Sequence, residues 1–172
     1  MSSSLVSLAS LVNAFNPVTP QMRVAAIIVR DKQILLVEHR KRGQHYWVLP
    51  GGRLDGLETL DAALRRELNE ELSLAARVGQ LVIVSEMLAP DRHVVSLMFH
   101  AEIGEGAEPR LDRADPVLAG WQWVSTEQLP RLDFRPPIAD AVQAVIAERF
   151  SGPVRVLGDT WRSEGKASGP RV

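Results

Sequence analysis

The chain has 172 residues, enough for one domain with a sizeable hydrophobic core. Its 20 basic and 21 acidic residues leave a formal net charge of −1, so no overall positive field favours DNA as a partner. The absence of cysteine excludes disulfides, thiolate metal sites and cysteine nucleophiles, and it fits a cytoplasmic protein. No apolar run approaches the roughly 18 residues of a membrane span, so we expect no membrane partner.

Both ends of the chain are predicted to lie outside a main domain of residues 22–162. Residues 1–21 carry apolar side chains at helical spacing, which predicts a short amphipathic helix: Leu5, Leu8, Val12 and Phe15. Such a helix would serve as a flap on the core or as a dimerisation segment, so a homodimer is one expectation. Residues 163–172 are polar and rich in Gly and Ser, which predicts a flexible tail.

The domain is predicted to open with a β-hairpin. Residues 24–29 and 34–37 are apolar runs of strand length around the turn-forming pair Asp31-Lys32, and a basic loop over 38–43 follows. The later elements are strands over 47–49, 81–86, 94–101 and 121–124, a long loop over 103–119, a helix over 137–150, and a last strand with Val154, Val156 and Trp161. This order predicts an α/β fold with a mixed β-sheet.

The clearest predicted helix covers residues 59–72. Thr59 is placed to cap it, and every fourth residue is a leucine, which gives one apolar stripe: Leu60, Leu64, Leu68 and Leu72. Three acids border this stripe at i, i+3 and i+4: Glu67, Glu70 and Glu71. Acids at the edge of a buried stripe repel one another unless a cation lies among them, and all-oxygen ligands suit Mg²⁺ or Mn²⁺. A solvated acidic helix end is the alternative for these three residues taken alone.

Residues upstream of the acids decide between these interpretations. Eight residues stand at the spacing G-x5-E-x7-R-E-U-x-E-E-x-G-U, where U is aliphatic: Gly52, Glu58, Arg66, Glu67, Leu68, Glu70, Glu71 and Leu74. With each residue type at roughly one in fifteen, the six fixed matches would arise by chance about once in ten million. This spacing is the Nudix signature, so the chain resembles the Nudix hydrolases. The resemblance implies a Nudix-type α/β/α sandwich over residues 22–162.

The chain departs from the signature at two places. Ser73 replaces a glycine that takes a left-handed conformation at the helix end, so we expect either a stability cost of about 1–2 kcal/mol or a slightly different helix exit. The loop carries Asp55-Gly56-Leu57 where the family more often has Glu-x-Gly, which leaves the shape of the loop open.

The resemblance implies a role for each matched residue. Glu67, Glu70 and Glu71 would bind the Mg²⁺, or Mn²⁺, that bridges the phosphates of the substrate. The carbonyl of Gly52 would add a metal ligand, or Gly52 would serve only as a turn residue. Glu58 and Arg66 would form a structural pair that ties loop to helix.

The general base varies among family members. The first choice here is Glu67, and the long loop offers further acids: Glu105, Glu108, Asp112 and Asp115. Asp115 is preferred within the loop because it lies nearest the strand over 121–124. Each loop acid is also interpretable as solvated.

Substrate binding is assigned to four residues: Arg40, Arg42, Arg53 and Pro90. The basic run at 40–42 would neutralise phosphates, or it would form a solvated turn. The four histidines show no metal-ligand spacing and receive no role: His39, His45, His93 and His100. Core packing is preferred over base stacking for the larger aromatic residues: Tyr46, Trp47, Phe99 and Trp121.

The resemblance implies hydrolysis of a small nucleotide. Enzymes of this family that act on ADP-ribose often carry a proline sixteen residues past the signature, and Pro90 stands sixteen past Leu74. ADP-ribose or a similar sugar nucleotide is therefore favoured. The alternatives are hydrolysis of an ordinary or oxidised nucleoside triphosphate and, in another class, a non-catalytic Nudix-like regulatory module.

Overall fold

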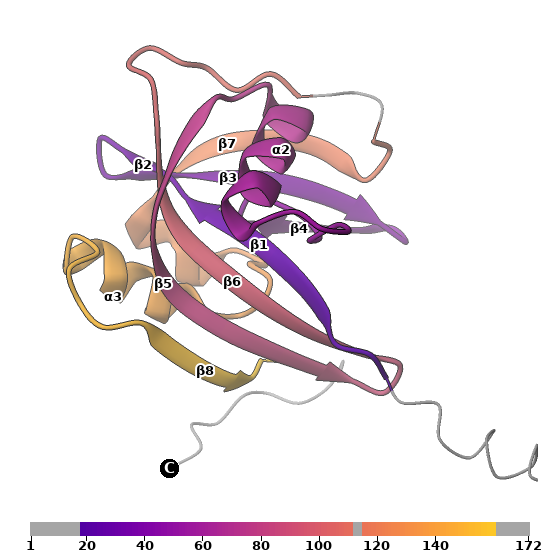
Figure 1. Ribbon diagram of the computed structural model, residues 1–172. Coiled ribbons are helices and arrows are strands. Elements are labelled where there is room, and N and C mark those ends of the chain that lie inside the picture. The colour runs from indigo at the N-terminus through magenta and orange to yellow at the C-terminus, as the bar shows by residue number, and fades with distance from the viewer. Residues whose placement is uncertain (1–17, 112–114, 161–172) are drawn as a thin grey trace, which may run out of the picture.

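The structure is a computed structural model that describes residues 18–111 and 115–160 (Figure 1). These residues form, in chain order, β1 (Gln21–Ile27), β2 (Val29–Arg30), β3 (Gln33–Lys41), β4 (Gln44–Val48), α2 (Leu60–Leu72), β5 (Ala76–Ala89), β6 (Arg92–Ile103), β7 (Leu118–Ser125), the 3₁₀ helix η1 (Thr126–Arg131), α3 (Ala139–Ala147) and β8 (Arg155–Asp159). The expected α/β class is confirmed.

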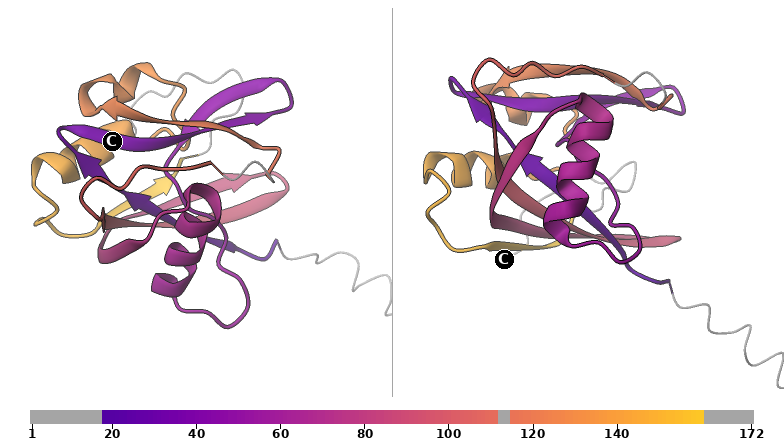
Figure 2. Two further views of the ribbon diagram at one scale, coloured as in Figure 1. Left: turned by 90° about the horizontal axis from the view of Figure 1, so that it is seen from above. Right: turned by 45° about the horizontal axis from the view of Figure 1, so that its top comes forward.

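The strands of the described chain form two four-stranded sheets, which Figures 1 and 2 show from three directions. The first has the order β1-β6-β5-β8, with β1 parallel to β6, β6 antiparallel to β5 and β5 parallel to β8. In the second, β3 pairs antiparallel with β2, β4 and β7. Parallel and antiparallel pairs thus occur together in the first sheet, as the expected mixed sheet requires.

The predicted hairpin at the start of the domain is wrong in its first strand. The apolar run 24–29 divides at the buried Ile28: β1 belongs to the first sheet, and only the short β2 pairs with β3. The physical reason is that β1 is covered on both faces, so its side chains are apolar without alternation and do not indicate the partner strand.

The two helices close two separate parts of the core. In β1, Val24 and Ala26 face the cluster around α2, whereas Ala25 and Ile27 face the cluster around α3. The same alternation continues in β3. Figure 1 shows α2 and α3 on opposite sides of β5 and β6. The strands therefore carry one helix on each side, as in an α/β/α sandwich.

Several predicted boundaries change. The helix over 59–72 is confirmed as α2, but the basic loop over 38–43 is wrong, because 38–41 belong to β3 and only Arg42-Gly43 form the turn to β4. Pairing between β3 and β4 extends both strands along a polar hairpin that hydrophobicity alone does not mark. The 3₁₀ helix η1 has no counterpart among the predictions, and the helix over 137–150 shortens to α3.

The predicted N-terminal helix, Trp161 and the tail over 163–172 lie outside the described residues. Within the described part, no helix combines the length and apolarity needed to cross a membrane.

Candidate active site

Helix α2 carries the candidate acids, and its local sequence fixes where it begins and ends. Thr59 Oγ1 accepts a hydrogen bond from the Ala62 N–H at 3.2 Å, which satisfies a free donor of the first turn. Ser73 ends the helix in the left-handed region at φ 53°, and the Leu74 N–H donates to the Leu68 carbonyl at 3.1 Å. Of the two expected consequences of the missing glycine, the structure shows the left-handed serine and not a different exit. The buried leucines orient the helix against the core.

The segment Pro50-Gly51-Gly52 brings the main chain directly beneath this helix. It runs along β1, where the Val24 N–H donates to the Gly52 carbonyl at 2.9 Å. Gly51 has φ 132°, and a Cβ there would lie 2.3 Å from the Val24 carbonyl oxygen. A Cβ on Gly52 would lie 2.1 Å from the carboxyl carbon of Glu67. Gly51 requires glycine because the strand backbone leaves no room for a side chain and φ is positive. At Gly52 a side chain would instead displace the carboxylate of Glu67.

Glu71 points inward from α2 toward this segment. Its carboxylate accepts a hydrogen bond from the Gly51 N–H at 3.0 Å. The pKa of Glu71 is raised to about 7, mainly by burial; the Gly51 hydrogen bond and the charge of Arg23 lower this pKa, and the charges of Glu67 and Asp115 raise it. A buried acid whose neighbours include two more acids is a place where a bound cation would relieve repulsion.

Arg66 joins helix α2 to the loop that precedes it. Its guanidinium donates to both carboxylate oxygens of Glu58, at 3.1 and 2.7 Å, and to the Arg53 carbonyl at 3.1 Å. It also donates to Glu67 at 3.0 Å and to Glu70 at 3.1 Å. These bonds raise the pKa of Arg66 and lower the pKa of Glu58. The predicted pair of Glu58 and Arg66 is therefore present, and Arg66 also binds two of the signature acids, Glu67 and Glu70.

The three signature acids differ in exposure, although they share one helix. The Glu67 side chain is 14% exposed and that of Glu70 is 57% exposed, while Glu71 bonds to Gly51. As they stand, no three His, Asp or Glu side chains within residues 18–111 and 115–160 converge closely enough to hold an ion. The arrangement therefore differs from the expected convergent cluster, because the guanidinium of Arg66 lies between Glu67 and Glu70.

The donor chemistry nevertheless fits Mg²⁺ or Mn²⁺. Carboxylate oxygens are the ligands that these hard cations prefer, and Glu67, Glu70 and Glu71 supply them from successive turns of α2. Gly52 itself lies next to the Glu67 carboxylate, and its carbonyl accepts one hydrogen bond from Val24, which leaves one lone pair for an ion.

Asp115 and two residues without a predicted role complete the surroundings. The Asp115 carboxylate accepts from the Val117 N–H at 2.8 Å at the entry to β7, and its charge acts on both Glu71 and His39. Arg23, on β1, donates to the Gly51 carbonyl and also acts on Glu71 and His39. No motif marks Arg23 or His39, so only the fold could place them here.

The other loop acids behave differently. Glu108 pairs with Arg30 at 2.8 Å, Glu105 is exposed, and Asp112 lies outside the described residues.

The residues predicted to bind substrate lie in separate parts of the fold. Arg40 is exposed on β3 opposite His45, and Arg42 lies in the following turn. Arg53 is exposed beside the acids, with its main chain bridged to Arg23. Pro90 lies in the turn between β5 and β6. Of these, only Arg53 has a contact that ties it to the residues around Arg66.

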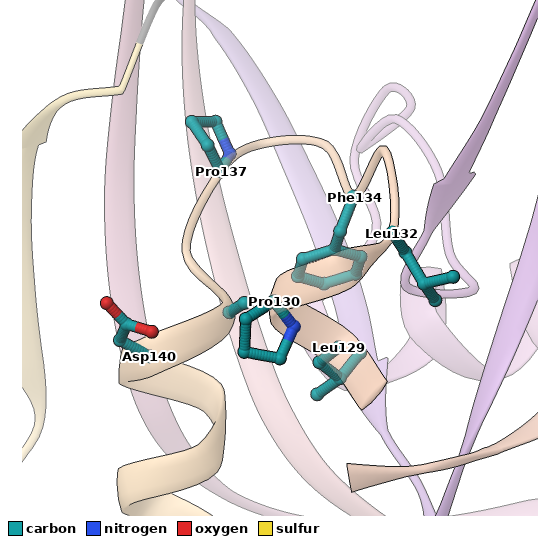
Figure 3. Close-up of a pocket in the computed structure, with 7 residues that line it drawn as sticks. Leu129, Pro130, Leu132, Phe134, Pro137 and Asp140 are labelled. Atoms are coloured by element: carbon teal, nitrogen blue, oxygen red, sulfur yellow. The ribbon is translucent and has the colours of Figure 1, made fainter. Parts of the chain in front are cut away.

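A cavity of about 220 Å³ lies elsewhere, between η1 and α3 (Figure 3). Most of the residues around it are apolar in type, and one is an acid: Leu129, Pro130, Leu132, Phe134, Pro137, Ala139 and Asp140. Leu129 and Phe134 belong to the core around α3, on the side away from α2. A cavity with one acid lacks the groups needed for phosphate chemistry, so the α2 region remains the candidate site.

Comparison with known proteins finds relatives of this chain both in sequence and in structure. The NUDIX domain family matches residues 19–145. The phosphatase NudJ of Escherichia coli K12 is 27% identical over 144 residues, which cover 81% of this chain and 92% of that protein. The crystal structure of a MutT NUDIX hydrolase from Burkholderia pseudomallei is 30% identical over 74% of this chain and 98% of that one, with a TM-score of 0.63. The solution structure of the E. coli ORF135 protein is 26% identical over 79% of this chain and 95% of that one, with a TM-score of 0.64.

Proposed function

Because the chain belongs to the Nudix family and is a hydrolase of phosphoanhydride bonds, we propose that its substrate is a nucleoside diphosphate linked to a second small group, with ADP-ribose or a similar sugar nucleotide favoured. The metal in this proposal is Mg²⁺, with Mn²⁺ as a substitute. The non-catalytic alternative is set aside, since the chain is an enzyme.

The observation that carries the proposal is the meeting of α2 with the segment Gly51-Gly52. Glu71 is bonded to the Gly51 N–H, and Glu67 lies over Gly52 with no room for a side chain between them. The nearby Asp115 adds a further negative charge, whereas Arg23 supplies a positive one. Such an excess of carboxylate charge beside the backbone suits a dication and, through it, a diphosphate.

The hydrolysis in this proposal uses one water. Its oxygen bonds to one phosphorus while the bond from that phosphorus to the bridging oxygen breaks, so that ADP-ribose yields AMP and ribose 5-phosphate. Bound at the signature acids, Mg²⁺ supplies charge neutralisation and a more acidic water. Arg66 holds Glu67 and Glu70 in place, and Arg53 lies beside them with an exposed side chain available to a phosphate.

Glu67 is the proposed general base, and Asp115 is the second choice. Glu67 is nearly buried and lies at the segment where the diphosphate would bind. Asp115 already accepts a main-chain hydrogen bond with one oxygen, which leaves the other oxygen for a water. Single-turnover rates separate the two: Glu67→Gln should slow cleavage by about 10²–10⁴-fold and Asp115→Asn much less, and the reverse order would exchange the roles.

The position of Pro90 supports ADP-ribose, as it stands sixteen residues past Leu74. The second candidate is a nucleoside triphosphate, ordinary or oxidised. This second candidate is favoured by the name of the NudJ relative, which is called a phosphatase. Cleavage of a sugar nucleotide between its two phosphates releases no free phosphate, whereas cleavage of a triphosphate can.

A substrate panel with Mg²⁺ and Mn²⁺ tests the proposal. The panel holds sugar nucleotides, dinucleoside polyphosphates and nucleoside triphosphates, and AMP, orthophosphate and pyrophosphate are measured separately. We expect AMP from ADP-ribose to appear fastest, and a clear preference for triphosphates would overturn the choice of substrate. The double variant Glu70→Gln/Glu71→Gln should be inactive, while Glu127→Gln, an exposed acid on η1, should keep full activity. Undiminished activity of the double variant would refute the mechanism.

A further inference from the structure

His39 occupies an irregular position in β3, at the edge of the candidate site. The register between β3 and β7 shifts here: Glu38 pairs with Gly120, but His39 pairs with Leu118, so Ala119 has no partner in β3. On the other side, His39 lies opposite Tyr46 of β4. Bulges of this kind re-aim a side chain and are enriched next to active sites.

The side chain of His39 has a buried nitrogen without a partner. Its Nε2 atom is inaccessible to solvent and makes no hydrogen bond within the described residues. The ring meets Tyr46 edge-on, with centroids 5.5 Å apart and planes at 67°, so packing holds its orientation. Buried polar atoms are nearly always satisfied, and an exception calls for a group that arrives later.

Two of the charges that act on His39 also act on Glu71. Arg23 and Asp115 act on both residues, and Lys41 acts on His39 as well. The ring also contacts Tyr46, which packs against the cluster around α2, so His39 lies on the α2 side of β3. Burial, followed by the positive charge of Arg23, lowers the pKa of His39 to about 4, so that the ring is neutral near pH 7. A neutral ring carries one N–H and one lone pair, and either nitrogen can hold the proton.

We propose that His39 contacts the substrate, with its Nε2–H donating a hydrogen bond to a non-bridging phosphate oxygen beside Arg23; this assignment rests on the proposed diphosphate substrate. A phosphate oxygen only accepts hydrogen bonds, so it satisfies Nε2 as a donor.

Three variants of His39 separate a hydrogen bond from packing. Glutamine places an N–H near the position of Nε2, asparagine reaches only the position of Nδ1, and leucine fills the space without a donor. We expect His39→Gln to stay within about fivefold of the wild type in kcat/KM. His39→Asn and His39→Leu should lose about 10- to 100-fold, the range for a hydrogen bond to a charged group.

A second, partly buried histidine provides the control. His100 on β6 stacks on Phe150 at 4.0 Å between ring centroids, and burial also lowers its pKa. It lies in the α3 side of the structure, so His100→Leu should keep wild-type kcat/KM. Urea unfolding supplies the second measurement. Since leucine removes an unsatisfied buried nitrogen, His39→Leu should unfold at the same or a higher urea concentration than the wild type.

The outcomes distinguish this inference from the proposed function. If the wild type cleaves a diphosphate and all three His39 variants match it, the role of His39 is refuted while the function stands. If glutamine is as damaging as leucine, or if activity falls only in proportion to stability, His39 is structural and the inference is again refuted.

Binding of α,β-methylene-ADP with Mg²⁺ gives a readout that does not need turnover. We expect a dissociation constant raised about 10-fold or more in His39→Leu and nearly unchanged in His39→Gln. A wild-type protein that binds this analogue but cleaves nothing would refute the proposed function and still test His39. A wild-type protein that neither binds nor cleaves a diphosphate would refute both.

Discussion

The inward position of Glu71 makes a strong prediction about stability in the absence of metal. Its pKa in the folded protein is about 7, above the ordinary value of 4.5, and burial is the main cause. The protonated acid is therefore favoured by folding. The protonated form of Glu71 contributes fully to the free energy of unfolding below pH 4.5, and this contribution is lost as the pH rises through 7. At about 1.4 kcal/mol per pH unit, this interval corresponds to about 3 kcal/mol lost by pH 8.

Glu71→Gln should remove this dependence on pH. The amide keeps the shape of the side chain, and its oxygen can still accept the hydrogen bond from the Gly51 N–H. We expect variant and wild type to have equal free energies of unfolding at pH 4.5 and the variant to be more stable by about 3 kcal/mol at pH 8. Urea unfolding in EDTA at four pH values between these limits measures the difference.

Two features of this experiment isolate Glu71. His39 has a lowered pKa and loses stability in the opposite direction, as the pH falls from 6.5 toward 4, but it is present in both proteins and cancels in the difference. Glu70→Gln is the matched control on the same helix, because its side chain is 57% exposed and should give no such pH-dependent gain. Equal unfolding free energies of wild type and Glu71→Gln at every pH would refute the reasoning from burial.

Three further substitutions test the same region. Gly52→Ala would bring a methyl group to 2.1 Å from the Glu67 carboxyl carbon, so we expect kcat/KM to fall by about 10²-fold in the activity assay. Ser73→Gly relieves a left-handed serine and should raise Tm by about 2–4 °C in calorimetry without loss of activity. Arg66→Lys cannot keep both bonds to Glu58, and a titration of activity with Mg²⁺ should show an apparent affinity about 10- to 100-fold weaker. A normal Mg²⁺ titration for this variant would show that Arg66 does not hold the acids.

The sequence alone determined helix α2 and the spacing of the signature. Thr59 and Ser73 set the ends of the helix through hydrogen bonds that span a few residues, and the leucine period sets its buried side. These features are local, so they survive in any fold that buries the leucines.

The tertiary structure decided the partners of these residues. The run 24–29 contains no feature that sends β1 to β6 and β2 to β3, since both choices bury the same side chains. Arg23 acts on both Glu71 and His39 only because β1 and β3 pack in the same cluster as α2, and no spacing along the chain encodes that meeting. Contacts between distant segments depend on packing of the whole core, whereas caps and helical periods depend on neighbours in the chain.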